Sequence, residues 1–310
     1  MRVLVTGGTG YLGAAIVRAL IAGGHTPVVF ARRAAQAKVA GEAFDGDVRD
    51  GPAVLRAARN ADAIVHTAAL VSIWHRQPST FDEVNVGGLE AVLAAARTLG
   101  IRRIVYTSSF LAHPPAGSQV PLRANDYQRT KVRAGGIAHE AIRAGLPIVS
   151  LVPGVVYGPG TQTEGNLIGR MVRDHLAGRL PGLVGADRCW SYAYVDDVAE
   201  AHVRALLPQI EPGEYVLGGD NQPQMRVFEI VREETGMPVP RRIPLPAAFA
   251  VACVEELRAR VTGRLPSITR GVVEILRHNW SLDSARSIDK LNYRTRPLAL
   301  GVRALLSAGS

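Results

Sequence analysis

Short apolar runs alternate with longer stretches of helical periodicity through the first half of the chain. Runs of strand length lie at residues 2–5, 26–31, 42–48, 63–66 and 104–106. Helical patterns lie between and after them, at residues 11–22, 52–59, 83–99 and 125–145. Alternation at this spacing predicts an α/β fold with a doubly wound parallel sheet, covered by helices on both faces.

The alternation weakens beyond residue 160, where helical patterns outnumber strands. Strand-like runs remain at residues 190–195 and 215–217, and we expect Asp196 and Asp197 to cap the helix after the first of them. The other segments are helical, at residues 166–176, 227–235, 247–261 and 268–277. We therefore predict a first domain over residues 1–160, completed by about residues 190–222, and a smaller, mainly helical C-terminal lobe, formed by residues 161–189 and 223–310.

The turn after the first strand carries three regularly spaced glycines, Gly7, Gly10 and Gly13. Gly7 permits backbone angles that a side chain forbids, Gly10 lets a pyrophosphate approach, and Gly13 lets the helix pack on the sheet. The amides at the helix start then face the phosphates, helped by the helix dipole. The pattern predicts a Rossmann-type dinucleotide site. The loop residues expected to line it are Gly7, Thr9, Gly10, Tyr11, Leu12 and Gly13.

The second predicted strand ends in Ala31-Arg32-Arg33 and carries no carboxylate. An acid at this place would bind the free 2′-hydroxyl of the adenosine ribose, whereas arginine pairs with a 2′-phosphate. Arg32 and Arg33 therefore favour NADP over NAD, although a pair of surface arginines is an alternative interpretation. We expect Asp47 and Val48, at the end of the third strand, to lie near the adenine.

Small and hydroxyl-bearing residues follow two later strands. Ala68 and Ala69 come after the strand at residues 63–66, and Thr107 and Ser109 come after the next one. Ligands of doubly wound sheets lie beyond the carboxyl ends of the strands. We therefore expect these residues to approach the cofactor and the substrate.

Tyr127 and Lys131 lie four residues apart in a predicted helix and therefore on one face of it. A phenol with a pKa near ~10 is a poor acid or base at neutral pH, and a nearby ammonium lowers that pKa. Of the 36 basic residues only Lys38, Lys131 and Lys290 are lysines, so Lys131 stands where this chain ordinarily uses arginine. A surface pair is the alternative. Combined with the glycines and Ser109, the pair indicates a proton-transfer site.

Composition narrows the class of protein further. A chain of 310 residues that is 47% hydrophobic can bury a full core, and no apolar run approaches the ~18 residues of a membrane span, so we expect a cytoplasmic protein. The net charge of +9 comes from scattered arginines, which suits an anionic ligand better than nucleic acid. Cys189 and Cys253 are expected to be buried, and no histidine spacing indicates a metal site.

Eight motifs in order resemble the extended short-chain dehydrogenase/reductase family over nearly the whole chain. They are TGGTGYLG, GDV at 46–48, TAA at 67–69, NVGG at 85–88, YTSS at 106–109, YQRTK at 127–131, PGVVYGPG at 153–160 and YVDDVA at 194–199. The resemblance implies that Tyr127 is the general acid/base, that Lys131 holds the nicotinamide ribose, that Ser109 binds the substrate oxygen and that Asn85 supports them. The nicotinamide contacts that it implies are Pro153, Val155 and Val156.

Within that family the chain looks most like the branch of dihydroflavonol reductases and hydroxysteroid dehydrogenases. Val152 stands where nucleotide-sugar epimerases commonly carry arginine, and the segment between Ser109 and Tyr127 is short. Asn166, followed by leucine, matches the pair with which sugar-nucleotide enzymes hold a pyrophosphate. An amide that caps the next helix explains Asn166 equally well.

Substrate contacts are expected in the lobe and in the loops that face it. The candidates are Trp74, His75, Phe110, Asn166, Arg188 and Trp190, with the indoles as apolar walls and Arg188 as a clamp for an anion. Core packing of the tryptophans and plain exposure of Arg188 are the alternatives. The helices at residues 83–99 and 127–144 would allow a homodimer about a two-fold axis, or they pack on the sheet alone.

Three functions fit these features. The first is an oxidoreductase that uses NADP, or NAD, to interconvert a carbonyl and an alcohol of a small molecule. The second keeps the cofactor bound and epimerises or dehydrates a nucleotide sugar, which Asn166 favours and Val152 disfavours. The third is a non-catalytic NADP sensor or scaffold, against which the intact set of Ser109, Tyr127 and Lys131 counts.

Overall fold

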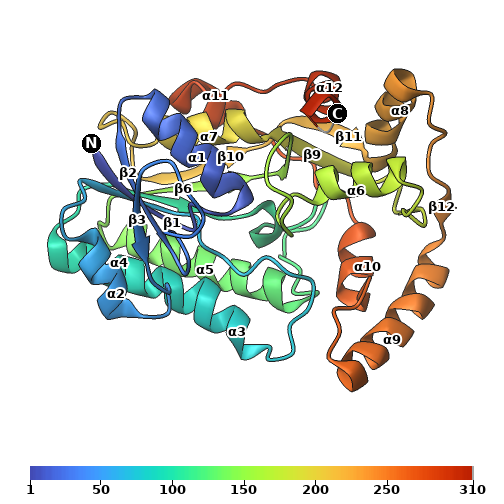
Figure 1. The fold of residues 1–310 in the computed structure, drawn as a ribbon, viewed down its shortest axis with the longest axis horizontal. Helices are drawn as coiled ribbons and strands as arrows, with labels where there is room; N and C mark the ends of the chain where they lie inside the picture. The colour runs from blue at the N-terminus through green and yellow to red at the C-terminus, as the bar shows by residue number, and fades with distance from the viewer. Residues whose placement is uncertain (309–310) are drawn as a thin grey trace.

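The computed structural model describes residues 1–308, and a seven-stranded parallel sheet forms its centre (Figure 1). The strands of this sheet are β1 (Arg2–Thr6), β2 (Thr26–Ala31), β3 (Glu42–Asp45), β4 (Ala63–His66), β5 (Ile104–Thr107), β6 (Ile148–Pro153) and β10 (Gly213–Leu217). Their order is β10-β6-β5-β4-β1-β2-β3. The order reverses at β1, which pairs with β2 on one side and β4 on the other. Ligands of such sheets bind beyond the carboxyl ends at this reversal.

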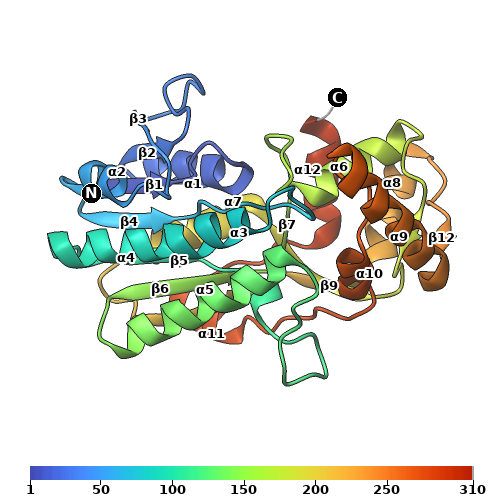
Figure 2. The ribbon, with the colours of Figure 1, turned by 90° about the horizontal axis from the view of Figure 1, so that it is seen from below.

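Helices cover both faces of the sheet, as Figures 1 and 2 show. One layer contains α1 (Tyr11–Ala22), α7 (Val195–Arg204) and α11 (Ala285–Leu291), and the other contains α2 (Gly51–Ala58), α4 (Gly88–Leu99) and α5 (Asp126–Arg143). Every residue of β4, β5 and β6 is buried, because parallel strands between two helical layers expose neither face. The predicted doubly wound fold is confirmed.

A smaller assembly lies at the carboxyl ends of the strands (Figure 1). Its strands are β7 (Val155–Tyr157), β9 (Cys189–Tyr194) and β11 (Asp220–Pro223), with the short pair β8 (Leu183–Val184) and β12 (Arg242–Ile243). Its helices are α6 (Leu167–Leu176), α8 (Gln224–Thr235), α9 (Leu245–Thr262), α10 (Arg270–Leu276) and α12 (Leu298–Ala308). A separate cluster of buried aromatic and aliphatic side chains holds most of these elements together. The strands β6, β7, β8, β11 and β12 were not predicted from the sequence; β7, β8 and β12 have three residues or fewer, and β11 is a polar segment.

Two local predictions are wrong. The third strand ends at Asp45 and does not reach residue 48, because the chain turns over residues 47–50, where the amide of Asp50 donates to the carbonyl of Asp47 at 3.0 Å. The acids at the start of α7 do not cap it, because the helix begins at Val195 without a side-chain cap. Asp197 lies in the first turn and accepts a hydrogen bond from the amide of Arg296 at 3.0 Å.

The helix predicted over residues 83–99 also differs. It starts earlier, with α3 (Ser79–Asp82), and passes through one wide π-helical turn over Glu83–Gly87 before α4 begins. Such turns are frequent at functional sites. The cysteines are less buried than predicted, since Cys189 is half-buried and Cys253 is exposed on α9.

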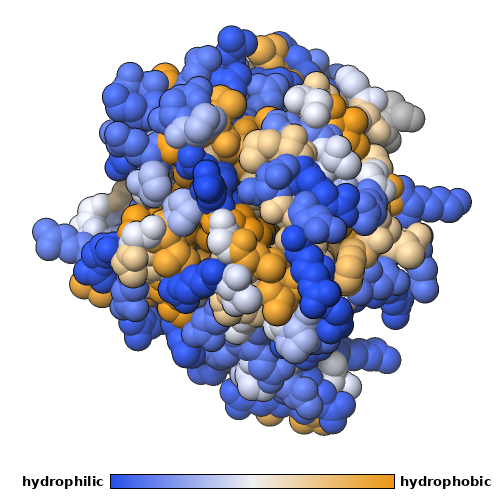
Figure 3. Space-filling model, turned by 90° about the vertical axis from the view of Figure 1, so that its left-hand side faces the viewer, coloured by the Kyte–Doolittle hydropathy of each residue, from blue (hydrophilic) through white to orange (hydrophobic). Residues whose placement is uncertain are grey.

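The two ends of the sheet differ in character. At the amino ends of the strands, apolar residues gather near the centre of the surface inside a polar margin (Figure 3). Arg103 closes this end by donating hydrogen bonds to the carbonyls of Leu207 and Ile210. Since ligands of such sheets bind beyond the carboxyl ends of the strands, we expect ligand contacts at the opposite end, which faces the smaller assembly. Among residues 1–308, no helix has the length and apolar character needed to cross a bilayer.

Candidate active site

The glycine loop between β1 and α1 leaves room for an anion. Gly7 has a φ of 73°, and a Cβ there would lie 2.7 Å from the Cα of Ala68. A Cβ on Gly13 would lie 2.2 Å from the carbonyl oxygen of Gly7, so both positions exclude side chains. Helix α1 starts after Gly10 without a side-chain cap and without an acid in its first turn. Its first amides are thus free to bind a phosphate.

Arg32 and Arg33 follow β2 and are exposed. Within residues 1–308 neither guanidinium forms an ion pair or donates a hydrogen bond, which leaves both for an anionic ligand. Asp47 is half-buried and pairs with Arg49 at 2.8 Å, and this bond lowers the pKa of Asp47 below its usual range. The charge of Arg32 acts on the pKa of Asp47 in the same direction. The cofactor roles of both residues stay predictions.

Ser109, Tyr127 and Lys131 come together beyond the carboxyl end of β5. Ser109 follows this strand and hydrogen-bonds the phenol of Tyr127. Tyr127 and Lys131 lie on the first turns of α5, whose start is fixed by Asn125, because its side chain accepts from the amide of Gln128 at 2.8 Å. Three groups that the sequence places on a strand end and a helix therefore share one site.

The electrostatics of the pair differ from the prediction. Burial raises the pKa of Tyr127 to about 12, although the hydrogen bond from Ser109 acts in the opposite direction. Lys131 is only 5% exposed, and burial lowers its pKa to about 8. Its Nζ donates to the carbonyl of Thr107 at 3.1 Å. The predicted lowering of the phenol pKa by the ammonium is therefore wrong, because desolvation dominates.

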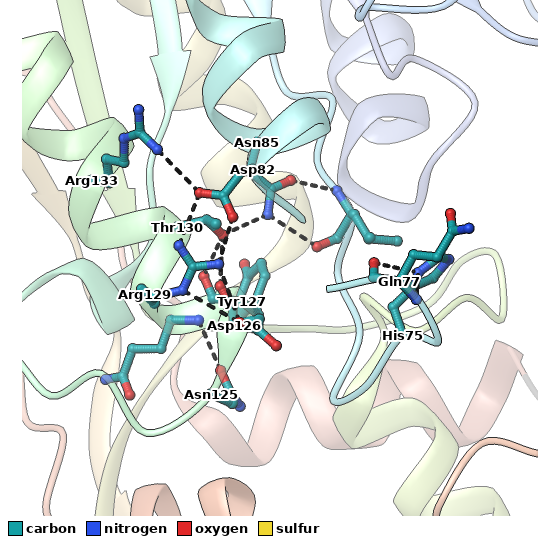
Figure 4. Close-up of polar contacts among 12 residues, drawn as sticks. His75, Gln77, Asp82, Asn85, Asn125, Asp126, Tyr127, Arg129, Thr130 and Arg133 are labelled. Atoms are coloured by element: carbon teal, nitrogen blue, oxygen red, sulfur yellow. Dashed lines mark hydrogen bonds and ion pairs between the residues drawn. The ribbon is translucent and has the colours of Figure 1, made fainter. Parts of the chain in front are cut away.

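Asn85 connects this site to the loop before α3. It lies in the π-helical turn, where its side chain accepts from the amide of Leu70 at 2.7 Å and donates to the hydroxyl of Thr130 at 3.0 Å (Figure 4). Thr130 lies on α5 between the candidate catalytic residues. The same figure shows Arg129 of α5 held by Asp82 at 2.6 Å. Asn85 and Asp82 thus fix α5 to α3 and to the loop at residue 70.

Two buried threonine–histidine pairs lie under the site, and neither was predicted from the sequence. The hydroxyl of Thr6 lies 2.7 Å from Nδ1 of His66, and the hydroxyl of Thr107 lies 2.9 Å from Nε2 of His202. Burial lowers the pKa of His66 to about 3 and that of His202 to about 4, so both imidazoles are neutral. The sequence feature that could have indicated such a pair is a histidine that follows an apolar run, as His66 follows residues 63–65. Thr107 also positions Lys131, so the second pair supports the candidate site.

The predicted nicotinamide contacts lie at the junction of the two sheets. Pro153 ends β6, and Val155 and Val156 begin β7. The hydroxyl of Tyr11, in the first turn of α1, donates to the carbonyl of Gly158 at 2.9 Å. This bond holds the segment after β7 against the glycine loop. We therefore expect the glycine loop and the segment at residues 153–156 to contact the same cofactor.

Comparison with known sequences decides the family. The profile of the NAD dependent epimerase/dehydratase family matches residues 3–218. The chain belongs to this family. A sterol demethylase protein B from Methylococcus capsulatus is 32% identical over 304 residues, covering 93% of this chain and 92% of that protein. A 2-alkyl-3-oxoalkanoate reductase from Stenotrophomonas maltophilia is 30% identical over 313 residues, covering 92% and 93% of the two chains.

A solved structure agrees with this assignment. The UDP-glucose 4-epimerase of Thermus thermophilus, in complex with NAD, superposes with a TM-score of 0.74 at 26% identity, covering 99% of this chain and all of that one. The resemblance to extended short-chain dehydrogenases/reductases is thus confirmed. The cradle of Gly7 and Gly13 and the uncapped start of α1 fit the dinucleotide on which the family depends.

The predicted substrate residues are spread over different environments. Phe110 and Trp190 are buried and pack together with Trp280, with ring centroids of Phe110 and Trp280 5.4 Å apart. Packing accounts for Phe110, whereas the buried indole N–H of Trp190 has no hydrogen-bond partner in the described residues. Arg188 is exposed and has no side-chain partner within residues 1–308. Trp74 and His75 are half-buried in the loop before α3. The substrate roles of these residues stay predictions.

Asn166 combines two features. Its Oδ1 accepts from the amide of Gly169 at 3.1 Å and so caps α6, as one of the two interpretations expects. Its Nδ2 is fully buried and has no hydrogen-bond partner in the described part of the chain. A buried donor without a partner is costly, so the cap alone does not explain why an amide stands there.

Proposed function

We propose that this protein is an oxidoreductase that uses NADP(H) to interconvert a carbonyl and an alcohol of a small molecule. The observation that supports it is the convergence of Ser109, Tyr127 and Lys131 beyond the carboxyl end of β5. In this proposal residues 1–160 and about 190–222 hold the cofactor. The remaining residues, 161–189 and 223–310, would select the substrate, apart from α11, which packs on β10 of the main sheet.

In the proposed reaction, side chains of this protein bind the substrate oxygen and donate the proton. A bound nicotinamide would supply or accept the hydride. Tyr127 is a protonated phenol at neutral pH, since its pKa is raised to about 12, and it would donate its proton from Oη to the oxygen of the carbonyl. Ser109 would hold that oxygen by a hydrogen bond. Lys131 uses one ammonium proton on Thr107, which leaves two for a ribose hydroxyl and for stabilising a phenolate at Tyr127.

The preference for NADP can be tested at the end of β2. We expect the double variant Arg32→Ala/Arg33→Ala to weaken NADPH binding by roughly 10- to 100-fold, the range set by charge-assisted hydrogen bonds. NADH affinity should change little, because NADH lacks the 2′-phosphate. Fluorescence titration of the reduced cofactors measures both constants. The control is Arg56→Ala/Arg59→Ala, which removes two arginines from the region of α2. Equal losses for NADPH and NADH would overturn the assignment.

A second function is supported by Asn166. Its unpartnered Nδ2 would bind a pyrophosphate oxygen of a nucleotide sugar, in which case the same residues would perform epimerisation or dehydration with a cofactor that is oxidised and reduced in each cycle. Val152 counts against this alternative, because the side chain at that place is apolar and fully buried in β6.

One assay separates the two functions. The enzyme is mixed with stoichiometric NADPH and a panel of ketones and aldehydes, and absorbance of the reduced nicotinamide is followed. The proposal expects net oxidation of NADPH equal to the alcohol formed. Turnover of a nucleotide sugar without net change of the cofactor would establish the alternative, and cofactor binding without either reaction would indicate a non-catalytic protein.

A further inference from the structure

Most of the large apolar side chains of helix α9 face solvent, whereas a helix that packs on a core normally buries them. Its inner face packs against α10 and Val184 of β8, with Ala248, Ala252 and Ala259 buried and Leu245 half-buried. Large residues occupy the opposite face, where Val254 is 67% exposed, Leu257 64% and Val261 80%. Figure 1 shows α9 at the margin of the molecule, next to α10. A helix that is apolar on both faces is normally covered on both.

The exposed face forms one continuous stripe. Ala250, Val254, Leu257 and Val261 are spaced by four, three and four residues, so they line one side of the helix. We call these four residues the outer stripe. The exposed Phe249 and Val251 border it. Solvent-facing apolar patches of this kind mark interaction surfaces.

The acidic and basic side chains around α9 lie in different places. Its two acids are engaged on the inner side: Glu255 pairs with Arg258 at 2.7 Å, and Glu256 pairs with Arg270 at 2.8 Å. At the carboxyl end of the helix stand three exposed arginines whose side chains have no hydrogen bond or ion pair within residues 1–308. They are Arg260, Arg264 and Arg76, and the guanidinium of Arg76 lies 3.6 Å from the Cβ position of Gly263.

We propose that α9 docks this protein on the surface of an anionic phospholipid bilayer. The outer stripe would lie among the upper acyl chains, and the three free arginines would contact lipid phosphates. The arrangement is that of an interfacial helix, with an apolar side flanked by arginine and with no free carboxylate. It is also compatible with the net charge of +9.

A second copy of the chain fits this face less well. Pairing two outer stripes would bring the free arginines of both copies together. The acids nearest to them, Glu255 and Glu256, are already paired within each copy. Like charges without carboxylates between them oppose such a dimer, whereas an anionic membrane surface neutralises them.

Vesicle flotation tests the proposal with the full chain. We expect the protein to float with vesicles of phosphatidylcholine and phosphatidylglycerol in equal parts, and to bind vesicles of phosphatidylcholine alone at least about tenfold more weakly, because the arginines then lack anionic partners. The variant Val254→Glu/Leu257→Glu should lose binding by about tenfold or more, since two side chains that would lie among the acyl chains become charged. The assay contains no substrate or cofactor, so its result is independent of the proposed function.

The matched control is Ile288→Glu/Leu300→Glu, which places two acids at similarly exposed apolar positions on α11 and α12. It should bind mixed vesicles nearly as well as the unmodified chain. Unchanged melting temperatures would show that all variants fold. The proposal fails if the unmodified protein does not float with mixed vesicles, or if both double variants lose binding equally. It also fails if gel filtration shows a dimer that only Val254→Glu/Leu257→Glu dissociates, because a second copy would then cover α9.

Discussion

Replacement of Tyr127 by phenylalanine should lower kcat for carbonyl reduction by about 10²- to 10⁴-fold, the usual contribution of a positioned general acid. In the proposed mechanism the phenol donates a proton to an oxygen that Ser109 holds, and phenylalanine keeps the ring while removing that proton. The affinity for NADPH should remain within about twofold, because the ring adds little binding to a cofactor held mainly through its phosphates. Steady-state kinetics and cofactor titration measure the two effects separately.

Tyr192→Phe is the matched control for this prediction. Tyr192 is fully buried on β9 and its hydroxyl has no hydrogen-bond partner in the described residues. Losing that hydroxyl should leave kcat nearly unchanged. If Tyr127→Phe retained most of the activity, Tyr127 would not be the acid. If both variants lost activity to the same extent, the loss would reflect disturbed packing and would say nothing about a proton.

The fold could be predicted from the sequence wherever one physical cause dominates. The strands at 26–31 and 63–66 and the helix at 11–22 match β2, β4 and α1 at both ends, because buried apolar runs and the glycines around them leave no alternative. The π-helical turn at Glu83–Gly87 could not be predicted in this way. It depends on what Asn85 binds, and Leu70 and Thr130 are distant along the chain.

The positions of the candidate site residues could also be predicted from the sequence, but their burial could not. Helical spacing places Tyr127 and Lys131 on one face, and a strand end places Ser109 where ligands of parallel sheets bind. Spacing carries no information on solvent exposure, however, and the direction of both pKa shifts is set by burial. The hydrogen bond between Thr107 and His202 could not be predicted either, because it depends on how β5 and α7 pack together.

Burial of Lys131 gives a stability effect with a definite sign. Its pKa falls from 10.5 to about 8 in the folded chain. Between these values the unfolded chain still binds a proton that the folded chain has released, so Lys131 adds to stability as the pH rises through this window. The full contribution is about 3 kcal/mol, since one pKa unit corresponds to about 1.4 kcal/mol. Below about pH 8 the ammonium is buried at a cost, and that cost is relieved only at higher pH.

Lys131→Met isolates this contribution, because methionine has similar length and does not titrate. The free energy of unfolding of the cofactor-free protein, measured with urea between neutral pH and about pH 10, should rise in the unmodified chain relative to Lys131→Met by most of ~3 kcal/mol. Other titrating groups cancel in the difference. Lys290→Met is the control: this ammonium is exposed and pairs with Asp289, so the corresponding difference should not increase with pH. A flat difference for Lys131→Met would mean that Lys131 is solvated, and the buried ammonium that the proposed mechanism places beside Tyr127 would be lost with it.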